Sequence, residues 1–315
     1  MIGAVAVASL RPFGSGLSRP ECVILTRCGT VCVSDRRGGV TIITPDGEGR
    51  LLCSGPLRPN GIALEQDGGF LIANMAHEGG VWRLPPGASQ ALPLVTEIDG
   101  RRLGSVNFVL VDARGRIWFS VSSLNAAAGR YDRRSVDGFI AMVEDGVARI
   151  VADGLCWTNE FRIDASGELL YVNETFARRL TSFRIGADGA LSDRRTVSVF
   201  GAGVFPDGLA LDAEGGVWIT SIISNRVIRV ASDGSHEVII EDPAPRLEEY
   251  ERAYEANTLT RAQLHRAHGS RLRNISSINF GGADLKTAYL GSLGGHQLET
   301  FRSPIAGQPP SHWLR

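Results

Sequence analysis

A sixfold repeat is the feature of this sequence that most limits how the chain can fold. Each copy begins at a polar residue and places apolar residues two and four positions later. In five of the six copies a glycine follows at eight positions, and further apolar residues follow at ten and twelve. Alternation with a period of two, interrupted by a glycine turn, predicts a β-hairpin. The six starting residues, which we call the anchors, are Glu21, Asn60, Asn107, Asn159, Asp207 and Ser276.

The spacing of the anchors indicates the blades of a β-propeller. Four of the five intervals lie between 39 and 52 residues, close to the blade length of roughly 40–50 residues. A third and a fourth apolar segment follow the hairpin in each copy, so each unit has four strands. We therefore predict an all-β protein, a six-bladed β-propeller that forms a single domain over residues 1–315.

Two segments depart from the regular repeat. Residues 241–270 lack a strand pattern and carry Tyr250 and Tyr254 at helical spacing, which predicts a helical insertion between blades five and six. The last unit runs out of chain near Phe301. We expect the apolar N-terminal segment 4–8 to supply its missing outer strand and close the ring, because an open ring would expose sheet edges.

Composition excludes several classes of function. Lys and Arg total 33 against 34 Asp and Glu, so no polybasic surface for nucleic acid is expected. The only lysine, Lys286, argues against Schiff-base chemistry. No apolar run reaches ~18 residues, so no membrane span is expected. The five cysteines form no Cys-x-x-Cys pair, which favours reduced, buried or half-buried thiols in a cytoplasmic protein.

The repeat also predicts where a site lies. Each anchor begins the innermost strand of its blade, so the anchors and the loops after the second strands share one mouth of the central channel. Turn chemistry alone explains Asn60 and Asp207, each of which lies between Pro and Gly, but it does not favour Glu21. Two carboxylates buried together are costly without a counter-charge. A divalent cation would offset that cost, and hard oxygen ligands suit Ca²⁺, Mg²⁺ or Mn²⁺.

Three segments of the repeat resemble a known family of propellers. The three segments are residues 58–64 (Arg-Pro-Asn-Gly-Ile-Ala-Leu), 106–112 (Val-Asn-Phe-Val-Leu-Val-Asp) and 205–212 (Phe-Pro-Asp-Gly-Leu-Ala-Leu-Asp). They are similar to the family of gluconolactonase, senescence marker protein (regucalcin) and luciferin-regenerating enzyme. The resemblance extends over about residues 17 to 303, and the ordered anchors make it specific. It implies a six-bladed propeller with a divalent metal in the central channel.

The same resemblance implies which residues form the site. Glu21, Asn159 and Asp207 match the family's metal ligands, for one divalent ion that we expect to be Ca²⁺, with Mg²⁺, Mn²⁺ and Zn²⁺ as alternatives. Asn107 matches a family residue that contacts substrate near the metal. Ser105 stands where lactonases of the family often carry an arginine. Three protein ligands leave positions for water and substrate, as in a catalytic site.

The function predicted on this basis is metal-dependent hydrolysis of a lactone or related cyclic ester, a small-molecule substrate. The metal would polarise the carbonyl and activate a water molecule in the channel. Asp207 would accept the proton and Asn107 would orient the substrate. A non-hydrolytic propeller of the same family and a scaffold that binds a ligand or a partner remain as alternatives, and the oligomeric state stays open.

Several polar residues, Ser105 among them, are candidates for further contacts to the substrate. Asn60 is a neighbouring anchor, and Asn125, His77 and His296 follow second strands of their blades. Each could equally be part of a solvated polar loop. His265 and His268 lie three residues apart in the predicted helical insertion. We interpret both as part of a solvated face of that helix.

Overall fold

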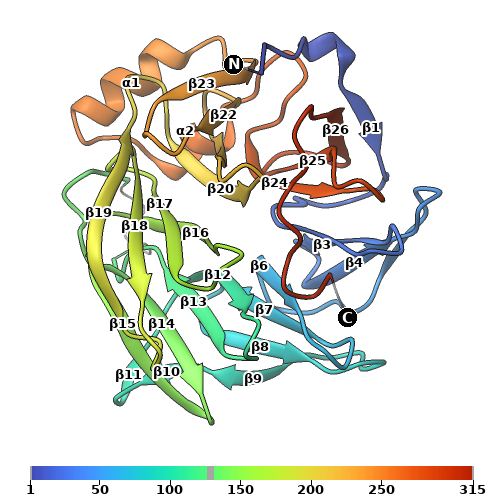
Figure 1. The fold of residues 1–315 in the computed structure, drawn as a ribbon, viewed down its shortest axis with the longest axis vertical. Helices are drawn as coiled ribbons and strands as arrows, with labels where there is room; N and C mark the ends of the chain where they lie inside the picture. The colour runs from blue at the N-terminus through green and yellow to red at the C-terminus, as the bar shows by residue number, and fades with distance from the viewer. Residues whose placement is uncertain (1, 126–130, 314–315) are drawn as a thin grey trace.

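The computed structural model describes residues 2–125 and 131–313. Six four-stranded antiparallel sheets follow one another around a ring, which confirms the predicted six-bladed propeller (Figure 1). Within blades one to five the strands pair in chain order, from the first near the centre to the fourth at the outside, whereas the outer strand of blade six comes from the N-terminus. Blades one and two contain β2 (Val23–Leu25), β3 (Val31–Asp35), β4 (Gly39–Ile43), β5 (Gly49–Leu51), β6 (Pro59–Leu64), β7 (Phe70–Asn74), β8 (Val81–Leu84) and β9 (Leu92–Val95).

The remaining strands complete the ring. A short hairpin, β10 (Glu97–Ile98) and β11 (Arg101–Arg102), precedes blade three. Blades three to six contain β12 (Val106–Val111), β13 (Ile117–Val121), β14 (Gly138–Glu144), β15 (Val147–Leu155), β16 (Thr158–Ile163), β17 (Leu169–Glu174), β18 (Arg179–Ile185), β19 (Leu191–Val199), β20 (Pro206–Leu211), β21 (Val217–Ser221), β22 (Arg226–Val230), β23 (His236–Glu241), β24 (Ile275–Gly281), β25 (Thr287–Ser292) and β26 (Leu298–Arg302).

An N-terminal strand closes blade six, but not the one predicted. The closing strand is β1 (Arg11–Phe13), which pairs with β26. The prediction of a strand over 4–8 is wrong, because this segment passes into a single 3₁₀ turn, η1 (Val7–Ser9). Its apolar side chains, among them Val5, pack against the core between blades five and six. The alternating apolar side chains, which suggested a strand, therefore pack on the outside of blade five.

The predicted helical insertion lies between β23 and β24, and so between blades five and six. Helix α1 (Leu247–Glu255) buries Tyr250 and Tyr254, and the Tyr254 hydroxyl donates to the carbonyl oxygen of Phe176 in blade four at 2.8 Å. Helix α2 (Arg261–His265) begins with a capping box in which Thr260 and Gln263 satisfy each other's backbone N–H groups. These contacts fix the insertion on one mouth of the ring.

In blades two to six a register shift at the start of the innermost strand takes the anchor out of regular pairing. The strand registers shift between residues 59 and 62, 106 and 108, 158 and 161, 206 and 209, and 275 and 277. A bulge bends the strand and redirects a side chain. In two blades the residue after the anchor is a glycine, Gly61 or Gly208, where a Cβ would lie within 2.6 Å of the neighbouring innermost strand. The bulges thus bring the anchors towards the axis.

Two tryptophans at equivalent repeat positions belong to the core of the protein. Trp118 and Trp218 are fully buried, and their indole N–H groups donate to Asp112 and Asp212 at 2.9 and 2.8 Å. All five cysteines are free, and four are buried. Cys28 is exposed, which corrects the expectation of burial for that thiol. Within the described residues, no helix has the length and apolar character needed to cross a membrane.

Candidate active site

A cavity of about 90 Å³ lies at the mouth where the innermost strands begin. Five of the six anchors line it, and the sixth, Ser276, instead donates to the backbone carbonyl of Glu21 at 3.2 Å. Residues that directly follow the second strands form much of its wall, as the repeat predicted. These wall residues are Met75, Ser122, Thr175, Phe176, Ile222 and Leu293.

Two buried carboxylates lie in this cavity, Glu21 and Asp207, exposed by only 3% and 4%. Burial raises the pKa of Glu21 to about 8, against the opposing effect of the Arg19 guanidinium. Burial also raises the pKa of Asp207 well above its usual value, and repulsion from Glu21 adds to the shift. Glu21 Oε2 and Asp207 Oδ1 have no hydrogen-bond partner. Each carboxylate therefore offers a free oxygen in a dry environment.

Asn60 holds Glu21 in place. Its amide nitrogen donates to Glu21 Oε1 at 2.8 Å and to the backbone oxygen of Asn107 at 2.9 Å. Its amide oxygen accepts from Arg19 at 2.9 Å. Both polar atoms of Asn60 are therefore engaged by the protein, so Asn60 is better described as a positioning residue than as the substrate contact that was considered from the sequence.

The two remaining asparagine anchors differ in their bonding. The amide nitrogen of Asn159 donates to Thr175 Oγ1 at 3.0 Å, and its oxygen accepts from the backbone N–H of Glu160 at 2.9 Å. An amide oxygen has a second lone pair, so Asn159 Oδ1 can still act as a ligand. Asn107 Oδ1 is buried without a partner. It is an acceptor and so suits a substrate hydroxyl or a cation, whereas stabilising an oxyanion needs the Nδ2 donor.

These residues fit a divalent metal. Glu21, Asn107 and Asp207 each hold a buried oxygen that no protein donor satisfies, and buried acceptors of this kind normally have a partner. The raised pKa values have the same cause, since the carboxylates lack a counter-charge. In the part of the chain that the structure describes, no three His, Cys, Asp or Glu side chains converge. The set therefore combines two carboxylates with amide oxygens, which are ligands of hard cations.

Behind the two carboxylates lies a buried ion pair that the sequence analysis did not identify. Glu160, exposed by 2%, pairs with Arg162 at 3.1 Å and accepts from the backbone N–H of Leu209 at 3.0 Å. Burial raises the pKa of Glu160, while Arg162 opposes the shift. Glu160 also raises the pKa values of Glu21 and Asp207, so its carboxylate adds to the repulsion that disfavours their ionised forms.

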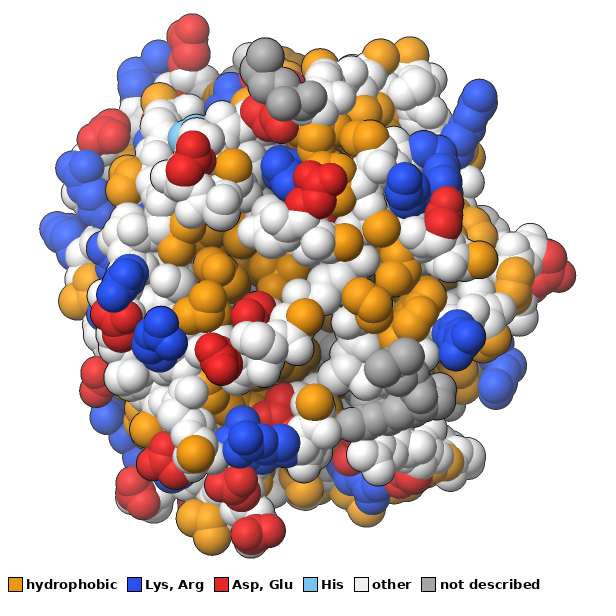
Figure 2. All heavy atoms as spheres, in the orientation of Figure 1, with side chains coloured by type: hydrophobic (Ala, Val, Ile, Leu, Met, Phe, Trp, Pro, Cys, Tyr) orange, Lys and Arg blue, Asp and Glu red, His pale blue; other side chains and the backbone are white. Residues whose placement is uncertain are grey.

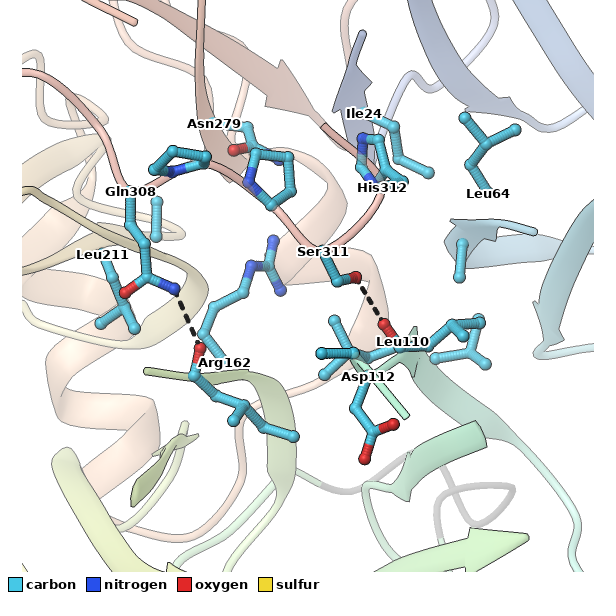
Figure 3. Close-up of a pocket in the computed structure, with 18 of the residues that line it drawn as sticks. Ile24, Leu64, Leu110, Asp112, Arg162, Leu211, Asn279, Gln308, Ser311 and His312 are labelled. Atoms are coloured by element: carbon cyan, nitrogen blue, oxygen red, sulfur yellow. Dashed lines mark hydrogen bonds between the residues drawn. The ribbon is translucent and has the colours of Figure 1, made fainter. Parts of the chain in front are cut away.

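Arg162 belongs to a second cavity of about 300 Å³ at the opposite mouth, lined mainly by apolar residues (Figure 3). The C-terminal segment 306–313 lies across it. Gln308 donates to the carbonyl oxygen of Ile163, and Ser311 donates to that of Val111, at 3.2 and 2.6 Å (Figure 3). Figure 2 shows hydrophobic side chains near the centre of the ring, in the same orientation as Figure 1. None of the five cavity-lining anchors lines this second cavity.

Four residues considered as substrate contacts lie outside the anchor cavity. Ser105 is half-buried and faces the carbonyl oxygen of Met75 at 3.5 Å, and Asn125 donates to Asp137 at 2.8 Å. His77 is exposed. His296 lines a different cavity and lies 3.1 Å from the carbonyl oxygen of Leu17. Because none of the four lines the anchor cavity, their contact with the substrate stays a prediction that the geometry does not favour.

Other residues reach the cavity without any signal in the repeat. Arg261, Leu264 and His265 of helix α2 line it, so His265 is part of the mouth and not merely of a solvated helix face. Arg19, Arg58, Tyr131, Trp157 and Phe176 also line it. Arg19 and Trp157 have positive φ angles of 50° and 55°, and such conformations in non-glycine residues are often found at functional sites.

Comparisons with known sequences support the family resemblance that the repeat suggested. The model of the family described as SMP-30/gluconolactonase/LRE-like region matches residues 20–248. The pentonolactonase XacC of Haloferax volcanii is 25% identical over 239 residues, which cover 75% of this chain and 67% of that protein. The adipocyte plasma membrane-associated protein Hemomucin of Drosophila melanogaster is 27% identical over 179 residues, which cover 53% of this chain and only 30% of that protein.

Solved structures share the fold. A gluconolactonase from Xanthomonas campestris has a TM-score of 0.70 at 23% identity, over 94% of this chain and 89% of that one. The calcium-binding protein regucalcin from Agrobacterium tumefaciens has a TM-score of 0.69 at 14% identity, over 98% of both chains. At these identities the likeness supports the propeller architecture and not a particular substrate.

Proposed function

Because the chain belongs to the SMP-30/gluconolactonase/LRE-like family, we propose that it is a divalent-metal-dependent hydrolase of a lactone or related cyclic ester. The observation that carries the proposal is the group of unpartnered buried oxygens on Glu21, Asn107 and Asp207 at one mouth of the channel. A pentonolactonase and a gluconolactonase among the similar proteins favour a lactone as the substrate. A scaffold would have no need for two uncompensated carboxylates there.

In this proposal Glu21, Asn159 and Asp207 hold the metal. When bound, a divalent cation supplies Lewis-acid polarisation of the ester carbonyl and lowers the pKa of a coordinated water. Asp207 accepts the water proton at Oδ1, the oxygen without a partner. Asn107 orients the substrate through Oδ1, and Asn60 keeps Glu21 in position. Water adds to the carbonyl carbon, the ring C–O bond breaks, and the products are a hydroxy carboxylate and a proton.

Metal removal tests this proposal directly. Protein stripped with a chelator is expected to lose hydrolysis of a panel of five- and six-membered lactones, and added Ca²⁺, Mg²⁺, Mn²⁺ or Zn²⁺ is expected to restore it. Elemental analysis of the untreated protein should find about one metal ion per chain. Full activity in stripped, metal-free protein would contradict the metal dependence, and a metal-loaded protein that hydrolyses no lactone or ester would favour a non-hydrolytic role.

The raised carboxyl pKa values predict how metal binding depends on pH. Since the pKa of Glu21 is about 8 in the folded protein and its ordinary value is 4.5, the metal-free protein loses stability as the pH rises from about 4.5 to about 8. A bound cation replaces the protons and removes this loss. Saturating Ca²⁺ should therefore raise the Tm by several degrees at pH 8 and by less at pH 5.5, as measured by scanning calorimetry. Equal shifts at both pH values, or an unchanged pH dependence in Glu21→Gln, would contradict the assignment of Glu21.

A further inference from the structure

We propose that the substrate carries an anionic group in addition to its lactone ring, and that Arg58 and Arg261 bind that group at the mouth of the cavity. This inference rests on the proposed hydrolase function and specifies its substrate class. Three arginines, Arg19, Arg58 and Arg261, line the cavity together with the metal-binding anchors. The only acidic residues in the described lining are Glu21 and Asp207, which lie buried among the anchors.

The arginines are not neutralised by neighbouring acids. Within residues 2–125 and 131–313, none of the three forms an ion pair with an Asp or Glu side chain within 4.0 Å. Arg19 donates to the Pro59 carbonyl oxygen and to Asn60, and Arg261 donates to the hydroxyl of Tyr131 at 2.8 Å. The side chain of Arg58 is half-buried with no hydrogen bond to the described residues. A half-buried guanidinium without a partner is costly, and a ligand anion would supply that partner.

The arginines also lie close enough to repel one another. Burial lowers the pKa of Arg58, and the neighbouring charges of Arg19 and Arg261 lower it further. The pKa of His265 is lowered by burial and by the same three arginines. Such a concentration of positive charge in a concave site attracts anions and raises their local concentration.

The charge of the mouth stays positive whether or not a metal is present. Without a metal, the two carboxylates carry at most two negative charges against the three guanidinium groups of the lining. A divalent cation held by the two carboxylates balances their two charges. In both states positive charge is left over, so the guanidinium groups do not serve only to neutralise the carboxylates.

A further donor lies in the same wall. Trp157 is exposed by only 6%, lines the cavity, and its indole N–H has no partner. Its ring packs against Tyr131 with centroids 4.7 Å apart, and Tyr131 in turn receives the Arg261 hydrogen bond. Carboxylate and phosphate oxygens both accept from such donors. With a cavity of about 90 Å³, the geometry favours one small ring that carries a short anionic substituent.

Matched lactones separate this inference from the proposed function. The probes are γ-butyrolactone and the same lactone with a carboxylate on its γ-carbon, with a phosphorylated lactone as a third arm that separates phosphate from carboxylate recognition. Wild-type protein with Ca²⁺ is expected to show a kcat/KM at least tenfold higher for the carboxylated lactone. Arg58→Gln and Arg261→Gln should each lower that ratio by about tenfold, whereas Arg266→Gln, at the exposed end of α2, should leave it unchanged. The ratio should also fall as salt is raised.

Product binding provides a readout that does not depend on turnover. In calorimetry the ring-opened dicarboxylate α-hydroxyglutarate should bind at least tenfold more tightly than γ-hydroxybutyrate, and Arg58→Gln should abolish the difference. Equal binding of the two products, or a preference for the uncharged lactone, would overturn the inference and leave the hydrolase proposal intact. Tight, Arg58-dependent binding of the dicarboxylate without hydrolysis of any lactone would support the anion site and reject the hydrolase.

Discussion

Asp207→Ala is expected to reduce kcat/KM for the best lactone of the panel by about 10³-fold or more. The change removes both a metal ligand and the proton acceptor, and loss of general base catalysis alone typically costs about 10²–10⁴-fold. The isosteric change Asp207→Asn should cause a similar loss, because it removes the charge and the basic oxygen while keeping the shape. Steady-state kinetics with excess metal measures the effect.

The folded state should survive this change. Burial and the Glu21 and Glu160 carboxylates raise the pKa of Asp207, so its ionised form destabilises the metal-free protein. Removing it should leave the metal-free Tm unchanged or higher, as is common where function opposes stability. Asp164→Ala, a carboxylate at the opposite mouth, is the control and should keep full activity. A folded Asp207→Ala protein with wild-type activity would reject the assigned role.

Asp212→Ala is expected to destabilise the protein by about 3–5 kcal/mol, which is the usual effect of breaking a buried ion pair. Asp212 Oδ2 accepts from Trp218 at 2.8 Å and from Arg229 at 2.7 Å, and Oδ1 accepts from the backbone N–H of Gly216 at 2.7 Å. Its loss leaves a fully buried indole N–H without a partner, and it leaves the mostly buried Arg229 guanidinium with only a longer ion pair to Glu214 at 3.6 Å. The Tm should fall by on the order of 10 °C in calorimetry.

The repeat itself supplies a matched comparison for this prediction. Asp112 occupies the equivalent position in blade three and accepts hydrogen bonds from Trp118 and Arg116. Asp112→Ala should therefore destabilise the protein by a similar amount. Asp164 occupies that position in blade four, but it accepts only from turn residues. Asp164→Ala should therefore cost only about 1 kcal/mol. Equal destabilisation by all three changes would show that the turn, and not the tryptophan contact, sets the effect.

Prediction from sequence succeeded where the information was local and repeated. Period-two alternation and glycine turns recur in every blade, so the number of blades and the place of the anchors could be counted. The β-bulges that aim Asn107 and Asp207 at the axis are not visible in the alternation, although Gly208 marks one of them by its close approach to the next strand. The ring-closing strand was misplaced because segment 4–8 carries an alternating apolar pattern, whereas the true closing strand, Arg11–Phe13, is short, mostly exposed and has no such pattern.

The rim of the site could not be predicted for a different reason. Whether a loop residue such as His77 or Asn125 faces the axis depends on loop geometry, which the repeat does not encode. Arg261 reaches the mouth only because α1 and α2 pack across blade four, and that contact joins residues far apart in the chain. The three arginines come from three different parts of the sequence, so no local pattern could group them.

Ring closure has a consequence for folding kinetics. The closing contact between Arg11 and Thr300 spans 289 positions, and contacts of such long range form slowly because their loop entropy is lost before any contact is gained. The five anchors in the cavity come from five different blades. A partly assembled ring would therefore hold blades that are each well formed and yet contain no complete site. Recovery of activity during refolding should thus lag behind recovery of β-structure.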